Sequence, residues 1–366
     1  MEPLYPRLIL DALAKVRYPG NGKNVVELGM VADDIRIDGR KVSFSLVFDK
    51  PTDPFIKSMI KAAEANIHAF VAPDVEVTVG VVTRQTPVEK VNPLPGVKNI
   101  IGVSSGKGGV GKSTVASNLA VALAAEGYKV GLLDADIFGP SMPKMFGVED
   151  EHLYMHEVNG RQLIIPLERY GVKLLSIGFL VDKNAPVLWR GSMASNALRQ
   201  LIEEADWGEL DYFLIDMPPG TSDIHLTLVQ TLALTGVVIV TTPQQVALAD
   251  ARKGIAMFTG DKVNVPILGL VENMAWFTPE KHPDEAYYIF GKEGGVALAR
   301  ELGVKLLAQI PIVGSICDGG DEGSPIALAE TVTGQAFRHL AHEVIDVVDR
   351  RNSELPPTHK VDVTRK

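Results

Sequence analysis

Cysteine is almost absent from this chain, which has one such residue, Cys317, in a length of 366. A single cysteine excludes an internal disulfide and is typical of proteins from a reducing compartment. The chain also contains no run of about 20 apolar residues, the length that a membrane-spanning helix needs. Its first residues lack the basic and then apolar pattern of a signal peptide. We therefore expect a cytoplasmic protein without a membrane span.

An excess of basic residues is missing as well. The formal net charge is -9 at pH 7, which argues against broad electrostatic binding to nucleic acid or to anionic membrane surfaces. Hydrophobic residues make up 46% of the chain and charged residues 22%, values typical of a globular protein. The length exceeds that of a typical single domain, so the sequence predicts two domains.

A glycine-rich stretch has the spacing of a phosphate-binding loop. Residues Gly106–Ser113 read G-K-G-G-V-G-K-S and match the pattern G-x-x-x-x-G-K-[ST]. An apolar run typical of a strand, Val97–Val103, precedes the loop, and the helix-forming sequence Thr114–Ala125 follows it. Glycines let the backbone approach a phosphate, and the free amides of a first helical turn point at it. The alternative is a glycine turn that matches the pattern by chance.

This loop predicts a site for ATP and Mg²⁺. Lys112 would offset the charge of the β- and γ-phosphates, and Ser113 would hold the metal through its hydroxyl. A second lysine, Lys107, is not needed to hold the phosphates. It would be more useful facing a second nucleotide across a dimer interface, where it would stabilise the charge of the transition state as an arginine finger does. The alternative for Lys107 is a solvated loop lysine. The residues expected to bind nucleotide here are Gly106, Lys107, Gly108, Gly109, Val110, Gly111, Lys112, Ser113 and Thr114.

Carboxylates follow two further strand-type runs. Tyr128–Leu133 is followed by Asp134 and Asp136, and the apolar run that begins at Tyr212 ends in Asp216. Ligands in open α/β sheets lie beyond the carboxyl ends of strands, so these side chains are expected beside the phosphates. A carboxylate at the end of a buried strand needs a partner, and Asp216 is predicted to bind Mg²⁺ directly or through water. The alternatives are a helix cap for Asp136 and a structural turn after Asp216.

The order of patterns predicts a small α+β unit at residues 1–85, a proline-containing linker at 86–98, an α/β unit at 99–350 and a polar tail at 351–366. Helix and strand patterns alternate through the α/β unit, as in a mostly parallel sheet with helices on both faces. In the small unit, Asp38-Gly39 is typical of a hairpin turn. Its expected helices are Pro6–Arg17 and Pro54–Val71, and its expected strands are Asn24–Met30, Asp34–Asp38, Lys41–Phe48 and Val75–Thr83.

Together these motifs resemble a known class of P-loop ATPases. The loop with two lysines resembles the deviant Walker A loop of the ATPases that partition plasmids, place division sites and build iron–sulfur clusters. Residues 99–350 resemble the Mrp branch of that class, also called ApbC-like, and residues 1–85 resemble the PaaD/SufT-like domain of iron–sulfur assembly factors. The stretches that carry the resemblance are Gly106–Thr114, Asp134–Ser141, Trp189–Gly191, Asp216–Asp223 and Val271–Met274.

The resemblance implies a role for several side chains. Asp136 would orient the attacking water, Asp134 would lie near Mg²⁺, and Asn273 would contact the adenine. Lys107 would reach the partner's nucleotide in a homodimer, and Gly220–Asp223 would be a second switch segment. The expected catalytic residues are then Lys107, Lys112 and Asp136, and the expected metal ligands are Ser113, Asp134 and Asp216.

The sequence departs from this family in its lack of thiols. Relatives usually carry C-x-x-C shortly after the Asn-Met pair, where two thiolates per chain hold a [4Fe–4S] cluster between protomers. Here residues 276–284 contain no cysteine, although Glu280, His282 and Asp284 are able to bind a metal; the alternative is a mobile polar loop. The turn at residues 49–54 also lacks the cysteine that many relatives have there. Cys317 is expected to be partly buried.

The predicted function is that of a slow, dimeric ATPase in iron–sulfur cluster assembly or in cluster transfer to apo-proteins. Its expected partners are a second copy and either apo iron–sulfur proteins or assembly scaffolds, with no nucleic acid and no membrane. One alternative is a nucleotide switch of the MinD/ParA kind. Another is an adaptor in protein maturation whose ATP binding sets dimerisation and which carries no cluster.

Overall fold

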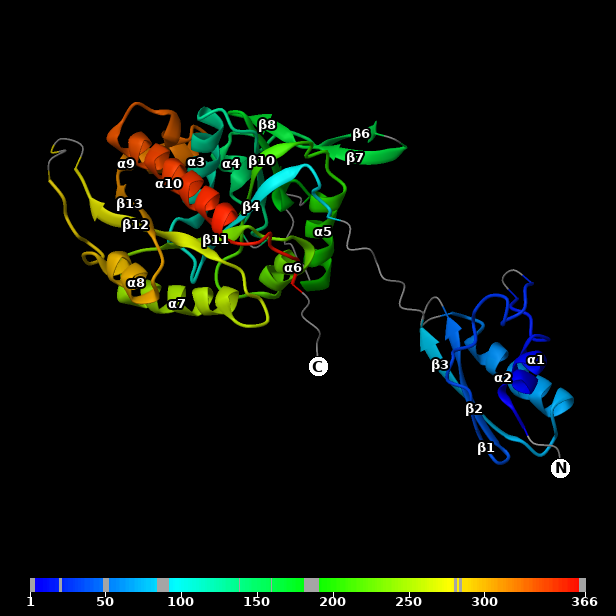
Figure 1. Ribbon diagram of the computed structural model, residues 1–366. Helices are drawn as coiled ribbons and strands as arrows, with labels where there is room; N and C mark the ends of the chain where they lie inside the picture. Colours follow the sequence, from blue (N-terminus) through cyan, green and yellow to red (C-terminus); the bar gives the residue numbers. More distant parts are fainter. Residues whose placement is uncertain are drawn as a thin grey trace. The chain divides into compact units, whose positions relative to one another are not determined.

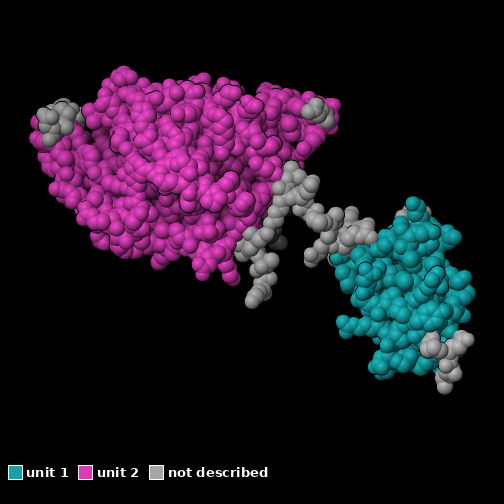
Figure 2. All heavy atoms as spheres, viewed as in Figure 1, with its two compact units in different colours: residues 1–91 teal, residues 92–366 magenta. Residues whose placement is uncertain are grey.

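The computed structural model describes residues 4–19, 22–48, 53–83, 92–137, 139–158, 160–180, 191–279, 282 and 285–361. The chain divides into two compact units, residues 1–91 and residues 92–366 (Figure 2). The first is a small α+β unit, and the second is an α/β unit with a mostly parallel sheet. This arrangement confirms the fold class that the sequence predicts.

In the described part of the first unit, helices α1 (Pro6–Leu13) and α2 (Ile56–Phe70) share a hydrophobic core with a sheet of strands β1, β2 and β3 (Figure 1). Strand β2 (Lys41–Phe48) buries every second side chain, because one face of the sheet packs on this core. It pairs antiparallel with β1 (Arg36–Asp38) through the expected turn, where Gly39 has a φ of +58°. Strand β3 (Glu76–Thr83) runs parallel to β2 after the α2 crossover.

The strand predicted at Asn24–Met30 is wrong, because these residues form turns. The Asn24 side-chain oxygen accepts hydrogen bonds from the amides of Val26 and Glu27 at 3.0 and 2.8 Å. Such local bonds offer the backbone an alternative to a sheet ladder. Val25 and Met30 are nevertheless buried, so the apolar residues of this segment anchor a turn to the core.

The second unit is built on an eight-stranded sheet with the order β13-β12-β11-β4-β10-β5-β9-β8 (Figure 1). Its neighbouring strands pair in parallel, except for β8 and β9 at one end, which are antiparallel. The strands are β4 (Val97–Ser105), β5 (Val130–Asp134), β8 (Leu167–Arg169), β9 (Val172–Ser176), β10 (Leu210–Asp216), β11 (Gly236–Thr241), β12 (Ile267–Phe277) and β13 (Leu306–Ile312).

A hydrophobic core lies on each face of this sheet. Helices α3, α4 and α10 pack into one core, and α5, α6, α7 and α8 pack into the other, as the sequence predicts (Figure 1). The helices are α3 (Lys112–Ala125), α4 (Met142–Met145), α5 (Gly191–Glu203), α6 (Asp223–Thr231), α7 (Gln245–Thr259), α8 (Gly294–Leu302), α9 (Gly314–Asp321) and α10 (Val332–Glu354), with 3-10 turns η1 (Ile177–Leu180) and η2 (Ile326–Leu328).

Some boundaries differ from those that the sequence predicts. Strand β4 begins at Val97, as the apolar run Val97–Val103 predicts, so the last two residues of the range expected to be linker belong to the sheet, where Val97 pairs with Leu210 of β10. Helix α10 continues to Glu354, past the expected end of the α/β unit at residue 350. Beyond it, the Val361 amide donates to the Val229 carbonyl at 3.0 Å, so the first part of the expected tail lies on the fold.

The hairpin of β6 (Tyr154–Val158) and β7 (Arg161–Ile165) was not among the elements expected from the sequence. It pairs only with itself within the described residues, apart from a single bridge between Ile164 and Ala205. Among the described residues, the helices are too short or too polar to cross a membrane.

Candidate functional site

The glycine-rich loop joins β4 to α3 at the carboxyl edge of the sheet, as predicted. Gly109 and Gly111 have φ values of +80° and +82°, which side-chain-bearing residues rarely adopt. A Cβ on Gly106 would collide with the Asp250 backbone, and one on Gly111 would collide with the Asn273 amide nitrogen. The loop therefore needs glycine both for its turns and for its close contacts with neighbouring elements.

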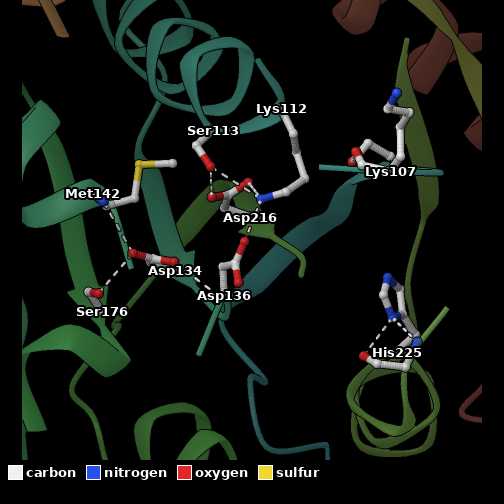
Figure 3. Close-up of polar contacts among 11 residues, drawn as sticks. Lys107, Lys112, Ser113, Asp134, Asp136, Met142, Ser176, Asp216 and His225 are labelled. Atoms are coloured by element: carbon white, nitrogen blue, oxygen red, sulfur yellow. Dashed lines mark hydrogen bonds and ion pairs between the residues drawn. The ribbon is translucent and has the colours of Figure 1, made fainter. Parts of the chain in front are cut away.

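A lysine, a serine and a carboxylate meet directly beneath this loop (Figure 3). Lys112 Nζ lies 2.5 Å from Asp216 Oδ1 and 3.6 Å from Asp136 Oδ2. The Ser113 hydroxyl donates to Asp216 Oδ2 at 2.6 Å. The structure thus brings together four of the residues that the sequence places at the site. A hydroxyl and a carboxylate side by side are oxygen ligands that suit a hard cation such as Mg²⁺.

The carboxylates of this cluster are buried, which makes their charged forms unfavourable. Asp216 is fully buried, and burial raises its pKa even though Lys112 and Ser113 favour the ionised form. Burial, together with the nearby Asp216 carboxylate, raises the pKa of Asp134 to about 7. Asp134 and Asp216 are direct neighbours on strands β5 and β10. A cation at this point of the site would relieve the charge of both.

Asp134 is bonded within the protein through both of its oxygens (Figure 3). One oxygen accepts from the Asp136 amide at 3.1 Å, and the other accepts from the Met142 amide at 3.2 Å and the Ser176 hydroxyl at 2.9 Å. These contacts hold the two ends of the segment that carries Asp136. They favour a supporting role for Asp134, and its role as a metal ligand stays a prediction.

Lys107 is half-buried and lies apart from this cluster (Figure 3). Its backbone carbonyl accepts from the Ser105 hydroxyl at 2.9 Å, which fixes the backbone and leaves the side chain to extend away from Lys112. Within the described residues the Lys107 ammonium forms no ion pair. The structure therefore does not join Lys107 to the other expected catalytic residues of the same chain.

A cavity of about 400 Å³ opens beside the loop, between α3, α9 and the end of β13. Its lining includes Gly111, Thr114, Asn273 and Cys317. The Asn273 side chain donates to the Val110 carbonyl at 2.9 Å, so it braces the loop from its place within β12. This hydrogen bond uses one of the two amide hydrogens of Asn273. The contact of Asn273 with adenine stays a prediction.

Cys317 is exposed, and the expectation that it is partly buried is wrong. It lies on helix α9, which turns the thiol towards the cavity instead of the core. The Asp321 carboxylate one helical turn away raises the pKa of the thiol. Cys317 is therefore protonated at neutral pH, and a protonated thiol is a weak nucleophile and a weak metal ligand.

The segment without cysteine follows the long strand β12, in which Trp276 and Phe277 still lie. His282 Nδ1 is 3.6 Å from Glu285, whereas Glu280 and Asp284 lie outside the described residues. The described part of the chain contains no group of three side chains placed to hold a metal ion. Trp189, Arg190 and residues 49–52 also lie outside the described ranges.

His225, on the first turn of α6, was not among the residues expected from the sequence. Its Nδ1 accepts from the Ser222 amide at 3.1 Å, as the third helical residue does in a capping box. The spacing S-x-x-H was the available signal, but glutamate or glutamine is usual at the last position. Just before it, the Gly220 amide donates to the Ser105 carbonyl at 2.9 Å, so the segment after Asp216 contacts the start of the glycine-rich loop.

Comparison with known proteins places the chain in a family. Residues 96–345 match the family described as the NUBPL iron-transfer P-loop NTPase, and residues 7–79 match a family described as iron–sulfur cluster assembly protein. The chain is 43% identical to the iron–sulfur cluster carrier protein of Synechocystis, over 92% of this chain and 96% of the relative. It is 51% identical to an Arabidopsis thaliana iron–sulfur protein required for mitochondrial NADH dehydrogenase, over 69% and 79% of the two chains.

A solved structure is similar as well. The nucleotide-binding protein of Archaeoglobus fulgidus in complex with ADP is 38% identical, with a TM-score of 0.56, and the match covers 66% of this chain and 92% of that one. The first of the two family matches covers more than half of the chain, and it includes the glycine-rich loop and the three aspartates. The chain therefore belongs to the NUBPL iron-transfer P-loop NTPase family, as an Mrp-type (ApbC-like) member with an N-terminal iron–sulfur assembly domain.

Proposed function

We propose that this protein binds and slowly hydrolyses ATP with Mg²⁺ as a homodimer, and that this cycle serves the transfer of iron–sulfur clusters to apo-proteins. The cluster of Ser113 with the buried Lys112 and Asp216 beneath the glycine-rich loop carries the proposal. The loop amides and the lysine suit phosphate, and the hydroxyl and carboxylate suit a divalent cation. The iron–sulfur role is supported by the names of relatives that match along both units.

In the hydrolytic step, each residue of the cluster has a separate task. A triphosphate carries more negative charge than Asp216 and would draw the Lys112 ammonium towards it, which leaves Asp216 and Ser113 to hold Mg²⁺. The metal would offset the charge that develops on the transferred phosphoryl group. Asp136 lies at the same edge, 3.6 Å from Lys112 Nζ, and would orient the attacking water. Asp134 would hold the Asp136 segment in place through its bonds to both ends of that segment.

Lys107 would complete the site of the partner chain. Its side chain extends away from the carboxylates of its own site, so it is free to face a nucleotide bound by a second copy. A cation that arrives from a partner stabilises the transition state only in the dimer, as an arginine finger does. Hydrolysis would then depend on dimerisation and would be slow in the monomer.

Complementation between two inactive variants tests this arrangement. Lys107→Ala and Asp136→Asn are each expected to bind ATP and to lose most of their phosphate release. Mixed dimers hold one site in which Asp136 is intact and Lys107 comes from the other chain, so mixing is expected to restore about a quarter of the wild-type rate. If Lys107 acts within its own chain, the mixture stays inactive. Sedimentation with and without ATP reports dimerisation in the same samples.

A second candidate function is an ATP-gated adaptor that binds iron–sulfur proteins but carries no cluster. The observation that favours it is the single cysteine, because a [4Fe–4S] cluster needs four ligands and a dimer offers two Cys317 thiols. Anaerobic reconstitution with iron and sulfide, followed by the absorption spectrum and the iron content per dimer, separates the two. A stable cluster that is lost in Cys317→Ala supports the carrier. ATP-dependent dimerisation without bound iron supports the adaptor.

A further inference from the structure

His225 holds the backbone of the segment that follows Asp216 (Figure 3). Its Nδ1 accepts a hydrogen bond from the Ser222 amide at 3.1 Å, and the Ser222 hydroxyl lies 3.2 Å from the same nitrogen. A neutral imidazole that accepts at Nδ1 carries its proton on Nε2. The contact therefore determines both the position of the Ser222 amide and the tautomer of the ring.

The ring of His225 is enclosed by protein. The residue is 1% exposed, and its ring meets that of Phe258 on α7 at a centroid distance of 6.0 Å. Burial lowers the pKa of His225 to about 4, so the ring is neutral at physiological pH. Within the described residues its buried Nε2 makes no hydrogen bond of good geometry, although the Pro218 backbone lies near enough to the ring to favour its charged form. A buried donor without a well-formed hydrogen bond adds little to the free energy of folding, so packing alone does not account for a histidine at this position.

The segment between Asp216 and α6 is tied at two points. The Gly220 amide is bonded to the Ser105 carbonyl at the start of the glycine-rich loop, and the Ser222 amide is bonded to His225. The first tie connects the segment to the phosphate-binding loop, and the second connects it to the rigid helix behind it. A change at the phosphates that moves Gly220 is therefore opposed by the hydrogen bond between the Ser222 amide and His225.

On the basis of the proposed ATPase function, we propose that His225 is a positioning residue for turnover: it holds the segment Met217–Ser222 through the Ser222 amide. His225 contributes no group to the Lys112, Ser113 and Asp216 cluster. Its loss therefore affects the catalytic rate constant and leaves the binding of ATP at the loop largely intact.

Two substitutions of the same residue separate this role from simple packing. His225→Phe keeps a ring against Phe258 and removes the acceptor, whereas His225→Asn places an amide oxygen near the position of Nδ1. In the full-length protein, His225→Phe is expected to lower kcat about tenfold and to change KM for ATP less than twofold. His225→Asn is expected to retain at least about half of the wild-type kcat. Thr231→Val, at the other end of α6, is the matched control for a buried change in this helix.

Nitrogen NMR of protein labelled at its histidines measures which ring nitrogen of His225 carries the proton, and so tests the hydrogen bond to the Ser222 amide directly. The His225 signal, assigned by its loss in His225→Asn, is expected to show an unprotonated Nδ1 and a protonated Nε2 from pH 6 to 8. The proposal is overturned by a charged ring in that range, by a wild-type kcat in His225→Phe, or by equal losses in both variants. If His225→Phe does not fold, the proposal is tested by the kcat of His225→Asn and by the tautomer of the His225 ring in the wild-type protein. If the wild-type protein does not hydrolyse ATP, the proposed function fails, and the NMR experiment still tests the contact.

Discussion

Lys112→Met is expected to destabilise the α/β unit at neutral pH, because it leaves Asp216 buried without its cation. Lys112 Nζ lies 2.5 Å from Asp216 Oδ1, and the side chains are 6% and 0% exposed. Methionine keeps much of the length and the apolar contacts of lysine, so the change removes mainly the charge. The neighbouring Asp134 and Asp136 add to the negative charge that is left behind.

The size of the effect follows from the burial of the pair. Removing one partner of a buried ion pair costs about 3–5 kcal/mol. For a unit of this size each kcal/mol lowers Tm by about 2–4 °C, so the expected fall is roughly 10 °C at pH 8. The loss is smaller at pH 5, because burial raises the pKa of Asp216 and the freed carboxylates take up protons. Lys144→Met breaks an exposed pair with Glu149 at 3.5 Å and is expected to cost at most about 1 kcal/mol.

Urea and thermal unfolding at pH 5 and pH 8 measure these differences. The double variant Lys112→Met/Asp216→Asn removes both charges and is expected to lie within about 1–2 kcal/mol of the wild type, because neutral groups replace a buried pair. A single variant as stable as Lys144→Met at pH 8 would contradict this account of the cluster. A double variant no more stable than Lys112→Met alone would show that packing, and not charge, causes the loss.

Three further predictions concern neighbouring features. Burial raises the pKa of Asp134 from 3.8 to about 7, so between these pH values the folded state binds a proton that the unfolded state does not. The free energy of unfolding, measured with urea, should therefore fall as the pH rises from about 4 to 7, and Asp134→Asn should flatten this profile. Alkylation of Cys317 by iodoacetamide should be slow, because the Asp321 carboxylate raises the pKa of the thiol. Its rate should fall about tenfold further when ATP fills the adjoining cavity, and it should not change in an ATP-free buffer of equal ionic strength. Gly111→Ala should weaken ATP binding measured by calorimetry and cost about 1–3 kcal/mol of stability, because its Cβ meets Asn273. The control Gly127→Ala, at φ +90° with open space around it, should cost about 1 kcal/mol and leave ATP binding unchanged.

The phosphate-binding loop could be predicted because it is a local feature. Gly106–Ser113 needs its residue types at fixed offsets, so its sequence alone indicates the strand, the turn and the helix start. The carboxylate at the end of an apolar run, Asp216, is likewise visible from its neighbours. Asn24–Met30 shows where such local reasoning fails, because an alternating apolar pattern also arises when a turn is anchored to the core.

The amino-acid sequence by itself determined the alternation of strands and helices around the site, the phosphate-binding loop, and which strand ends carry polar groups. Only the tertiary structure decided which of those groups meet, because strand β10 inserts between β4 and β5, and local patterns do not encode the order of strands in a sheet. That order places Asp216 beside Asp134 and within reach of Lys112. The burial of His225, two residues beyond the stretch Asp216–Asp223, includes a contact of its ring with Phe258 of α7, and local patterns do not encode such a contact either.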